Sequence, residues 1–418
     1  MSKKIPGLLA LLAFLGLSLF LINCGTSSSR PSGVLYVLSQ GENNVGSYAI
    51  DLSNGNLSLI NKTSPADTTP SSILLDPAGT VAYVLNTGSN SITTYTTSSD
   101  GSLSAPTSTA LPVQNSVALA RDAAGTFLFV VSQGTIPPPP GGSPCPHPEP
   151  NSECPALTVF TIQSDSTTLT QVGDPVALNQ VPTSVASTTV TTTLPDRTTL
   201  TKTLLYITND LDLTHVNDNT VAAYQVDATS GAVTAQSNPP YVTGSVPTAV
   251  DAVQTTPTGG SGGLFVYVAN SGSGSGANSL SIFQVCTEVN ATCTAVDVTA
   301  TNNTLKPVGT PVSVGLNPVA MTVDPTNNFL YVVNHGGSTV SGFRINPTTG
   351  ALSTLTPATV STGLDPVAIT MHSSGKFLFV SNNGSSNISG FTADTSNGAL
   401  SNATNVTSTA QPAGLVAK

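Results

Sequence analysis

Three of the four histidines lie in segments rich in turn-forming residues, where an imidazole could act on a bound molecule. This side chain changes its charge near neutral pH, so it can serve as a general base, and its neutral form binds metal ions. His215 and His335 are therefore candidate catalytic residues, and His147 is a candidate binding residue. No spacing ties the three together, and we favour the simpler interpretation that they are unrelated surface histidines.

Acidic and amide side chains crowd the segment 210–219, which reads DLDLTHVNDN. Oxygen ligands at this density could hold Ca²⁺. The candidate metal ligands are Asp210, Asp212 and Asp218, and the candidate ligand-binding residues are the same three with Asn217 and Glu42. The segment lacks the glycine and the terminal glutamate of an EF-hand loop, so a solvated acidic loop is the favoured alternative. The sequence suggests no cofactor other than Ca²⁺.

Four of the five cysteines form two local pairs, Cys145 with Cys154 and Cys286 with Cys293. Such pairs in an exported chain predict two disulfides. A zinc site is the alternative, but it would need the four thiols together, or thiols with histidine. The two pairs fall in different repeats of the chain, which disfavours that alternative.

The N-terminal residues 1–24 have the pattern of an export signal. Lys3 and Lys4 precede an apolar run over residues 7–22, which is short for a membrane span. The run ends at Cys24 and resembles the bacterial lipobox, in which the cysteine is lipidated, although Asn23 departs from that pattern. An uncleaved anchor or a free secreted protein is the alternative. We expect a lipid-anchored protein of the cell envelope, with a flexible tether over residues 25–33.

A repeated unit determines the fold prediction. Residues 317–352 and 365–400 each contain an apolar strand led by proline, a tight turn, a strand ending in Asn-x-Gly, an alternating third strand and a short fourth strand. Four short strands bounded by turn residues are typical of one propeller blade. An aromatic residue marks the second strand of every copy: Tyr36, Tyr83, Phe129, Tyr206, Tyr267, Tyr331 and Phe379.

The first and last copies are incomplete in complementary ways. The copy that begins at Gly33 lacks its proline-led strand, and residues 411–418 (QPAGLVAK) supply one. We therefore predict an all-β, seven-bladed β-propeller over residues 34–418, with blades of four antiparallel strands and a C-terminal strand that closes the first blade. We expect it to be a monomer.

Loop length indicates which rim of the propeller carries function. Three consecutive blades enlarge the loop after the second strand, at residues 135–156, 210–219 and 271–278, and long loops on a rigid scaffold favour binding. We call this rim the top. The insertions 188–202 and 286–306 are expected at the bottom or outer edge, as decoration. Asparagine or serine at the end of each second strand is interpreted as turn chemistry rather than as a binding ring.

Strings such as LYVVNHG, FVYVANSG and LFVSNNG resemble the YVTN-type β-propeller repeat. With seven copies of this repeat, the chain resembles the lactonase family, which includes 6-phosphogluconolactonase-like proteins. The resemblance implies a lactone hydrolase. A phosphorylated lactone is disfavoured, because the expected top rim is acidic and nearly free of cations. We favour a propeller that binds a small molecule, glycan or envelope protein through its top loops, with hydrolysis of a non-phosphorylated lactone as the alternative.

Other functions are excluded by composition and by missing motifs. The formal net charge is −10, and lysine and arginine are not clustered anywhere, which excludes nucleic acid as a partner. The chain has no Gly-x-Ser-x-Gly segment and no glycine-rich loop between a strand and a helix.

Overall fold

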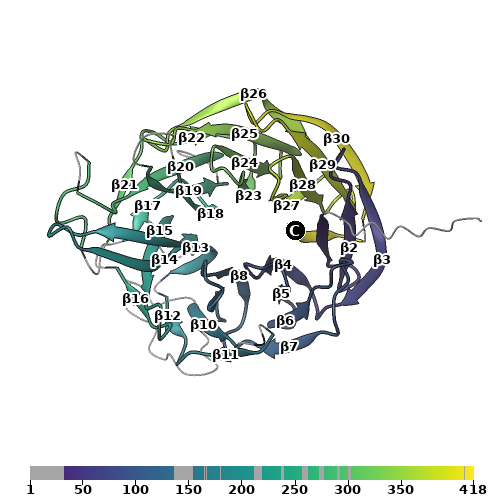
Figure 1. The fold of residues 1–418 in the computed structure, drawn as a ribbon, viewed down its shortest axis with the longest axis horizontal. Helices are drawn as coiled ribbons and strands as arrows, with labels where there is room; N and C mark the ends of the chain where they lie inside the picture. Colours follow the sequence, from purple (N-terminus) through teal and green to yellow (C-terminus); the bar gives the residue numbers. More distant parts are fainter. Residues whose placement is uncertain are drawn as a thin grey trace, which may run out of the picture. The chain divides into compact units, whose positions relative to one another are not determined.

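The protein is described from a computed structural model. The described residues are 33–135, 154–163, 165, 167–178, 180–210, 219–236, 240–256, 262–272, 277–289, 292–299, 303–408 and 410–418. In these ranges the regular elements are all β-strands, so no helix in them could cross a membrane. The strands form seven separate antiparallel sheets arranged as a ring, the predicted seven-bladed β-propeller (Figure 1).

Each blade begins with an inner strand at the ring centre, followed by strands that lie progressively further out (Figure 1). Blade 1 contains β1 (Val34–Ser39), β2 (Asn44–Ile50), β3 (Leu57–Pro65) and β31 (Pro412–Ala417), and blade 2 contains β4 (Pro70–Leu75), β5 (Val81–Asn86), β6 (Ser91–Thr96) and β7 (Thr107–Ala110). Blade 6 contains β23 (Pro318–Val323), β24 (Phe329–Asn334), β25 (Thr339–Ile345) and β26 (Leu352–Ser361), and blade 7 contains β27 (Pro366–Met371), β28 (Phe377–Asn382), β29 (Asn387–Ala393) and β30 (Leu400–Thr407).

The other three blades differ from the four-strand prediction, because their outer strand is broken in two. Blade 3 contains β8 (Ser116–Arg121), β9 (Phe127–Ser132), β10 (Ala156–Ile162), β11 (Leu169–Gln171) and β12 (Val176–Ala177). Blade 4 contains β13 (Val181–Thr193), β14 (Thr199–Asp210), β15 (Thr220–Val226), β16 (Val233–Ala235) and β17 (Tyr241–Val242), and blade 5 contains β18 (Pro247–Gln254), β19 (Leu264–Asn270), β20 (Ser279–Val285), β21 (Leu305–Pro307) and β22 (Val312–Ser313). Gly173 and Gly309 occupy two of the breaks at positive φ, which extended strands do not use.

The predicted closure of the ring is confirmed. Strand β31 pairs antiparallel with β1, with one register shift between Val37 and Ser39, and Val34 and Lys418 exchange backbone hydrogen bonds of 3.1 and 2.8 Å. The C-terminal strand thereby becomes the inner strand of blade 1, and no inner edge of that blade is left open.

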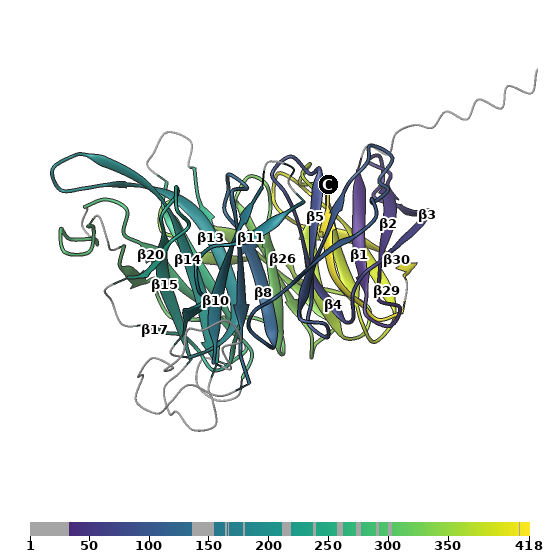
Figure 2. The ribbon, with the colours of Figure 1, turned by 90° about the horizontal axis from the view of Figure 1, so that it is seen from below.

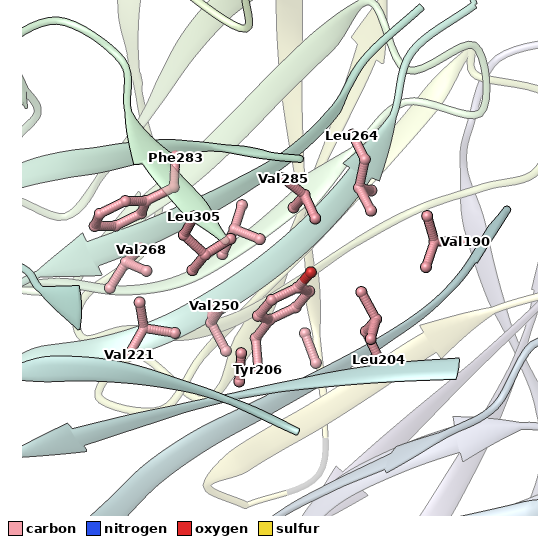
Figure 3. Packing of buried hydrophobic residues seen from close by; sticks show 13 residues of the cluster. Val190, Leu204, Tyr206, Val221, Val250, Leu264, Val268, Phe283, Val285 and Leu305 are labelled. Atoms are coloured by element: carbon pink, nitrogen blue, oxygen red, sulfur yellow. The ribbon is translucent and has the colours of Figure 1, made fainter. Parts of the chain in front are cut away.

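The core lies between neighbouring blades and is dominated by the second strands. Their marker aromatics are fully buried, and the cluster between blades 4 and 5 surrounds Tyr206 (Figure 3). Blades are also joined through a turn glycine of the next blade. Tyr267 donates a hydrogen bond of 2.9 Å to the Gly350 carbonyl, and a Cβ on Gly350 would lie 2.3 Å from the Phe265 ring. Glycine is therefore required at this close approach.

Candidate functional site

The inner strands surround a central cavity of about 450 Å³. Its lining is apolar or hydroxylic, with side chains such as Val319, Ile369 and Thr183. The hydroxyl of Thr183 in blade 4 donates to the Pro247 carbonyl in blade 5 at 2.6 Å. The hydroxyl of Thr248 in blade 5 donates to the Pro318 carbonyl in blade 6 at the same distance. These hydroxyls therefore join neighbouring inner strands. This part of the channel offers shape and apolar surface but no ionisable group.

The top mouth of the channel is ringed by the residue that follows each second strand. In three blades its side chain donates a hydrogen bond to the carbonyl of a proline at the first or second position of the next inner strand: Gln133 to Pro182 at 3.0 Å, His335 to Pro366 at 3.1 Å and Asn383 to Pro412 at 3.5 Å. Because a carbonyl can only accept, Nδ1 of His335 carries a proton in this contact. His335 is half-buried, and its catalytic role stays a prediction.

The remaining top-rim candidates are dispersed or fall outside the described residues. Glu42 is exposed on blade 1 and accepts a hydrogen bond from Asn44, while Asp210 is half-buried at the end of β14 in blade 4. Outside the described residues lie Cys24, His147, Asp212, His215, Asn217 and Asp218. Among the described residues, no three His, Cys, Asp or Glu side chains group closely enough to hold a metal ion. The Ca²⁺ site over residues 210–218 therefore stays a prediction.

The asparagines that end the second strands have a structural role, as expected. Asn86, Asn334 and Asn382 are buried, and each donates from Nδ2 to a hydroxyl of the third strand in its own blade, at 2.9–3.0 Å. Their Nδ2 groups therefore hold the second and third strands together, while the Oδ1 atom of each is buried without a hydrogen-bond partner.

The cysteine pairing is confirmed where the structure describes both partners. Cys286 and Cys293 form a disulfide, and both are fully buried. Cys154 is also disulfide-bonded, but its predicted partner Cys145 lies outside the described residues.

A second cavity, of about 480 Å³, opens at the bottom end of the channel. Its walls come mainly from β8, β13 and β18, and it shares Leu74 and Val250 with the central cavity. Thr188 and Thr189 also line it, which corrects the expectation that the insertion 188–202 is decoration. The reason is that β13 continues past the point where other inner strands turn, and Figure 2 shows the β13–β14 hairpin extending beyond its neighbours.

Asp251 is the one carboxylate among the residues that line either cavity. It lies on β18 opposite Tyr267 of β19, and the backbone N–H of Ala252 donates to its Oδ1 at 2.8 Å. Among the described residues, no donor contacts Oδ2. Desolvation by the surrounding protein raises the pKa of this carboxyl to about 6.

Arg121 is the one cation among the same lining residues. It ends β8, and two of its nitrogens are fixed to backbone carbonyls: Nε donates to Leu75 at 2.6 Å and Nη1 to Asp122 at 2.9 Å. Within the described part of the chain nothing accepts a hydrogen bond from Nη2. Burial lowers the pKa of the guanidinium, which nonetheless remains a cation at neutral pH.

Sequence reasoning missed this pair, although the repeat contains a signal for Asp251. The marker aromatic of each second strand pairs with one inner-strand residue: Leu74, Ala120, Ala186, Asp251, Thr322, Thr370 and Val416. Aligning the blades on their aromatics would have identified one charged residue at a position that is otherwise apolar or hydroxylic.

The comparison with protein families agrees with this architecture. A family model described as "Lactonase, 7-bladed beta-propeller" matches residues 28–121 and 202–364, which together make up more than half of the chain. The chain belongs to this family. No curated protein sequence matches this lactonase propeller.

Solved structures with the same fold cover nearly the whole lactonase propeller. A periplasmic gluconolactonase from Pseudomonas aeruginosa has a TM-score of 0.63 and 17% identity, covering 92% of this chain and 98% of its own. A candidate 6-phosphogluconolactonase from Bacteroides fragilis has a TM-score of 0.64 and 16% identity, covering 94% and 99%. At these identities the similarity supports the fold of the lactonase propeller, and its activity must be argued from its own residues.

Proposed function

We propose that this lactonase propeller hydrolyses a lactone that carries no phosphate group. The observation that supports this most directly is the charge inventory of the channel, in which the residues lining the two cavities include one arginine and one carboxylate. A phosphate dianion is usually held by several cations or by clustered backbone N–H groups. The cavities of about 450 and 480 Å³ are large enough for a small cyclic ester.

The test is a panel of lactones offered to the purified full-length protein in detergent. Ring opening of γ-butyrolactone, glucono-δ-lactone and dihydrocoumarin would be followed by acid release, with the spontaneous rate subtracted. We expect enzymatic turnover on at least one uncharged lactone and slower turnover on a phosphorylated sugar lactone. A folded protein that turns over none of them would contradict the proposal and would favour the alternative, a propeller that binds a glycan or an envelope protein through its top loops.

We also propose that the protein is exported and anchored to a membrane of the cell envelope by lipid on Cys24. The charged, apolar and cysteine segments of residues 1–24 support this, and the buried disulfide of Cys286 and Cys293 is typical of oxidising compartments. The lipidated N-terminal peptide should be detected by mass spectrometry of the membrane fraction. Cys24→Ser should release the protein from that fraction, and retention of the variant there would contradict lipid anchoring.

A further inference from the structure

We propose that Asp251 and Arg121 are the catalytic pair of the lactone hydrolase, with Asp251 as the general base that activates water and Arg121 as the group that stabilises the oxyanion. This inference rests on the proposed function and assigns the chemistry to the bottom opening of the channel rather than to the top rim. Its starting point is that both side chains line one cavity and that each leaves a polar atom without a protein partner.

The backbone holds Asp251 rigidly. Its preceding residue, Val250, packs into the cluster between blades 4 and 5 (Figure 3), and the β18–β19 register places Asp251 opposite the fully buried Tyr267. The Ala252 N–H donates a hydrogen bond to Oδ1 of Asp251. One carboxylate oxygen is thus fixed by its own strand and the other is available to a molecule in the cavity, which is the arrangement that a general base requires.

The charge state of Asp251 also suits this role. Burial raises the pKa of the carboxyl to about 6, so the group is mainly ionised at pH 7 but is a stronger base than an ordinary aspartate. The titratable groups around it are Arg121, which lines the same cavity, and Tyr267 on the paired strand. The Tyr267 hydroxyl donates to the Gly350 carbonyl, and burial keeps this phenol neutral at pH 7 by raising its pKa.

The position of Arg121 complements that of Asp251. Two backbone carbonyls orient the guanidinium, and its remaining amino group, Nη2, has no acceptor among the described residues. Arg121 and Asp251 are both partly buried and form no ion pair with each other; the carboxylates that act electrostatically on the guanidinium are Asp122 and Asp76. The cavity between their strands therefore accommodates a molecule that accepts a hydrogen bond from the arginine and offers a proton to the carboxylate.

The reaction balances with these two residues and water. Oδ2 of Asp251 accepts a proton from the water, whose oxygen forms a bond to the lactone carbonyl carbon. Arg121 donates a hydrogen bond to the resulting oxyanion. The intermediate collapses by breaking the bond between that carbon and the ring oxygen, which takes the proton back from Asp251 as a hydroxyl. The product is a hydroxy acid, whose carboxyl releases a proton to solvent.

A purely structural role for Asp251 is difficult to reconcile with its surroundings. A half-buried, desolvated carboxylate with one oxygen unpartnered costs folding free energy, and other blades have Leu74 or Val416 at the same register position. The propeller would be more stable with an apolar residue there. A catalytic role explains why the Asp251 carboxylate is present in the channel although it lowers the stability of the fold.

The experiment compares isosteric variants at matched positions. Asp251→Asn keeps the contact with Ala252 but removes the base, and we expect kcat to fall by about 100-fold or more with KM little changed. The control is Thr322→Val, at the same register position in blade 6, which should retain wild-type kcat. Arg121→Lys keeps a charge but loses the fixed geometry, and we expect kcat/KM to fall by about tenfold or more. Its control is Arg344→Gln, whose guanidinium stacks on Phe329.

The pH profile separates catalysis from structural support. Wild-type kcat/KM should decline as the pH falls through about 6, and in Asp251→Asn the residual activity should lose this step. Wild-type turnover in a folded Asp251→Asn variant would overturn the catalytic assignment while leaving the proposed function intact. A wild-type protein that turns over no lactone would overturn both.

Discussion

The two mouths of the channel both contain polar side chains, and three at the top can be compared with two at the bottom by the partners that they contact. At the top, Gln133, His335 and Asn383 donate to the backbone of the neighbouring blade. At the bottom, Asp251 and Arg121 keep one polar atom each without a protein partner. Missing partners alone do not distinguish the two mouths, because Oδ1 of Asn86, Asn334 and Asn382 at the top is also unpaired. What distinguishes Asp251 and Arg121 is that both also line a cavity that a ligand could enter.

The sharpest test of this contrast uses a satisfied carboxylate at the bottom rim. Asp324 follows β23 and accepts hydrogen bonds from the N–H groups of Asn328 and Phe329 at 2.7 and 2.6 Å. Asp324→Ala leaves these donors unpaired, and we expect the free energy of unfolding to fall by about 2–4 kcal/mol, measured by urea denaturation. A change below about 0.5 kcal/mol would mean that carboxylate satisfaction does not distinguish structural from functional acids in this ring.

The opposite change is expected at the unsatisfied carboxylate. Asp251→Leu places in blade 5 the residue type found as Leu74 in blade 2, and it removes a half-buried, desolvated charge. We expect stability at pH 7 to rise by about 1–2 kcal/mol, read as a higher denaturation midpoint, together with loss of lactone turnover. Lower stability with unchanged turnover would assign Asp251 to the fold.

A third test concerns pH. His372 replaces, in blade 7, the turn aspartate found as Asp76, Asp122 and Asp324, and it is 3% exposed beside the chain closure. Its Nδ1 accepts the Ser374 N–H at 3.1 Å, so the buried ring is neutral. Desolvation lowers its pKa, although a hydrogen bond with the Lys418 backbone opposes the shift.

The folded protein therefore binds this proton less readily than the unfolded chain does. The stability contributed by His372 is present above the unfolded-state pKa of about 6.5 and is lost as the pH falls below that value. We expect a loss of about 1 kcal/mol or less between pH 7 and pH 5. His372→Asp restores the aspartate of the other blades, and the loss of unfolding free energy between pH 7 and pH 5 should be smaller in this variant by the contribution of His372, measured by urea denaturation at both pH values. An equal loss in the variant would show that another group causes it.

The smallest effect is expected at the top mouth. His335→Ala removes one hydrogen bond to the Pro366 carbonyl, which should lower the unfolding free energy by about 1 kcal/mol or less. If Asp251 is the base, lactone turnover by this variant should change less than about threefold. A loss of about 100-fold would move the chemistry to the top and reverse the comparison between the two mouths.

Much of the fold could be predicted from the sequence because propeller blades repeat locally. The marker aromatics such as Tyr83 and Tyr331, and the closing strand at residues 412–417, depend on patterns within one unit or on its missing part. The breaks in the outer strands at Gly173 and Gly309 were not predicted, since a short polar edge strand has little pattern to interrupt.

The candidate site was harder to predict than the fold. Arg121 and Asp251 are 130 positions apart and lie on blades 3 and 5, and no short motif contains either of them. Their significance depends on atoms left without partners, which only the packed structure reveals. The sequence prediction of catalytic histidines in the loops rests on residue type alone. Residue type does not show whether a side chain is already hydrogen-bonded to the backbone.

The pairing of β31 with β1 also bears on the order of assembly. A chain made from its N-terminus presents β1 long before residues 412–417 emerge, so the inner edge of β1 stays open until those residues are available. The first strand to appear is the last to be paired on both sides. Until then this edge is the natural site for a chaperone to protect, and a protease that removes residues 412–418 would reopen it in the folded protein.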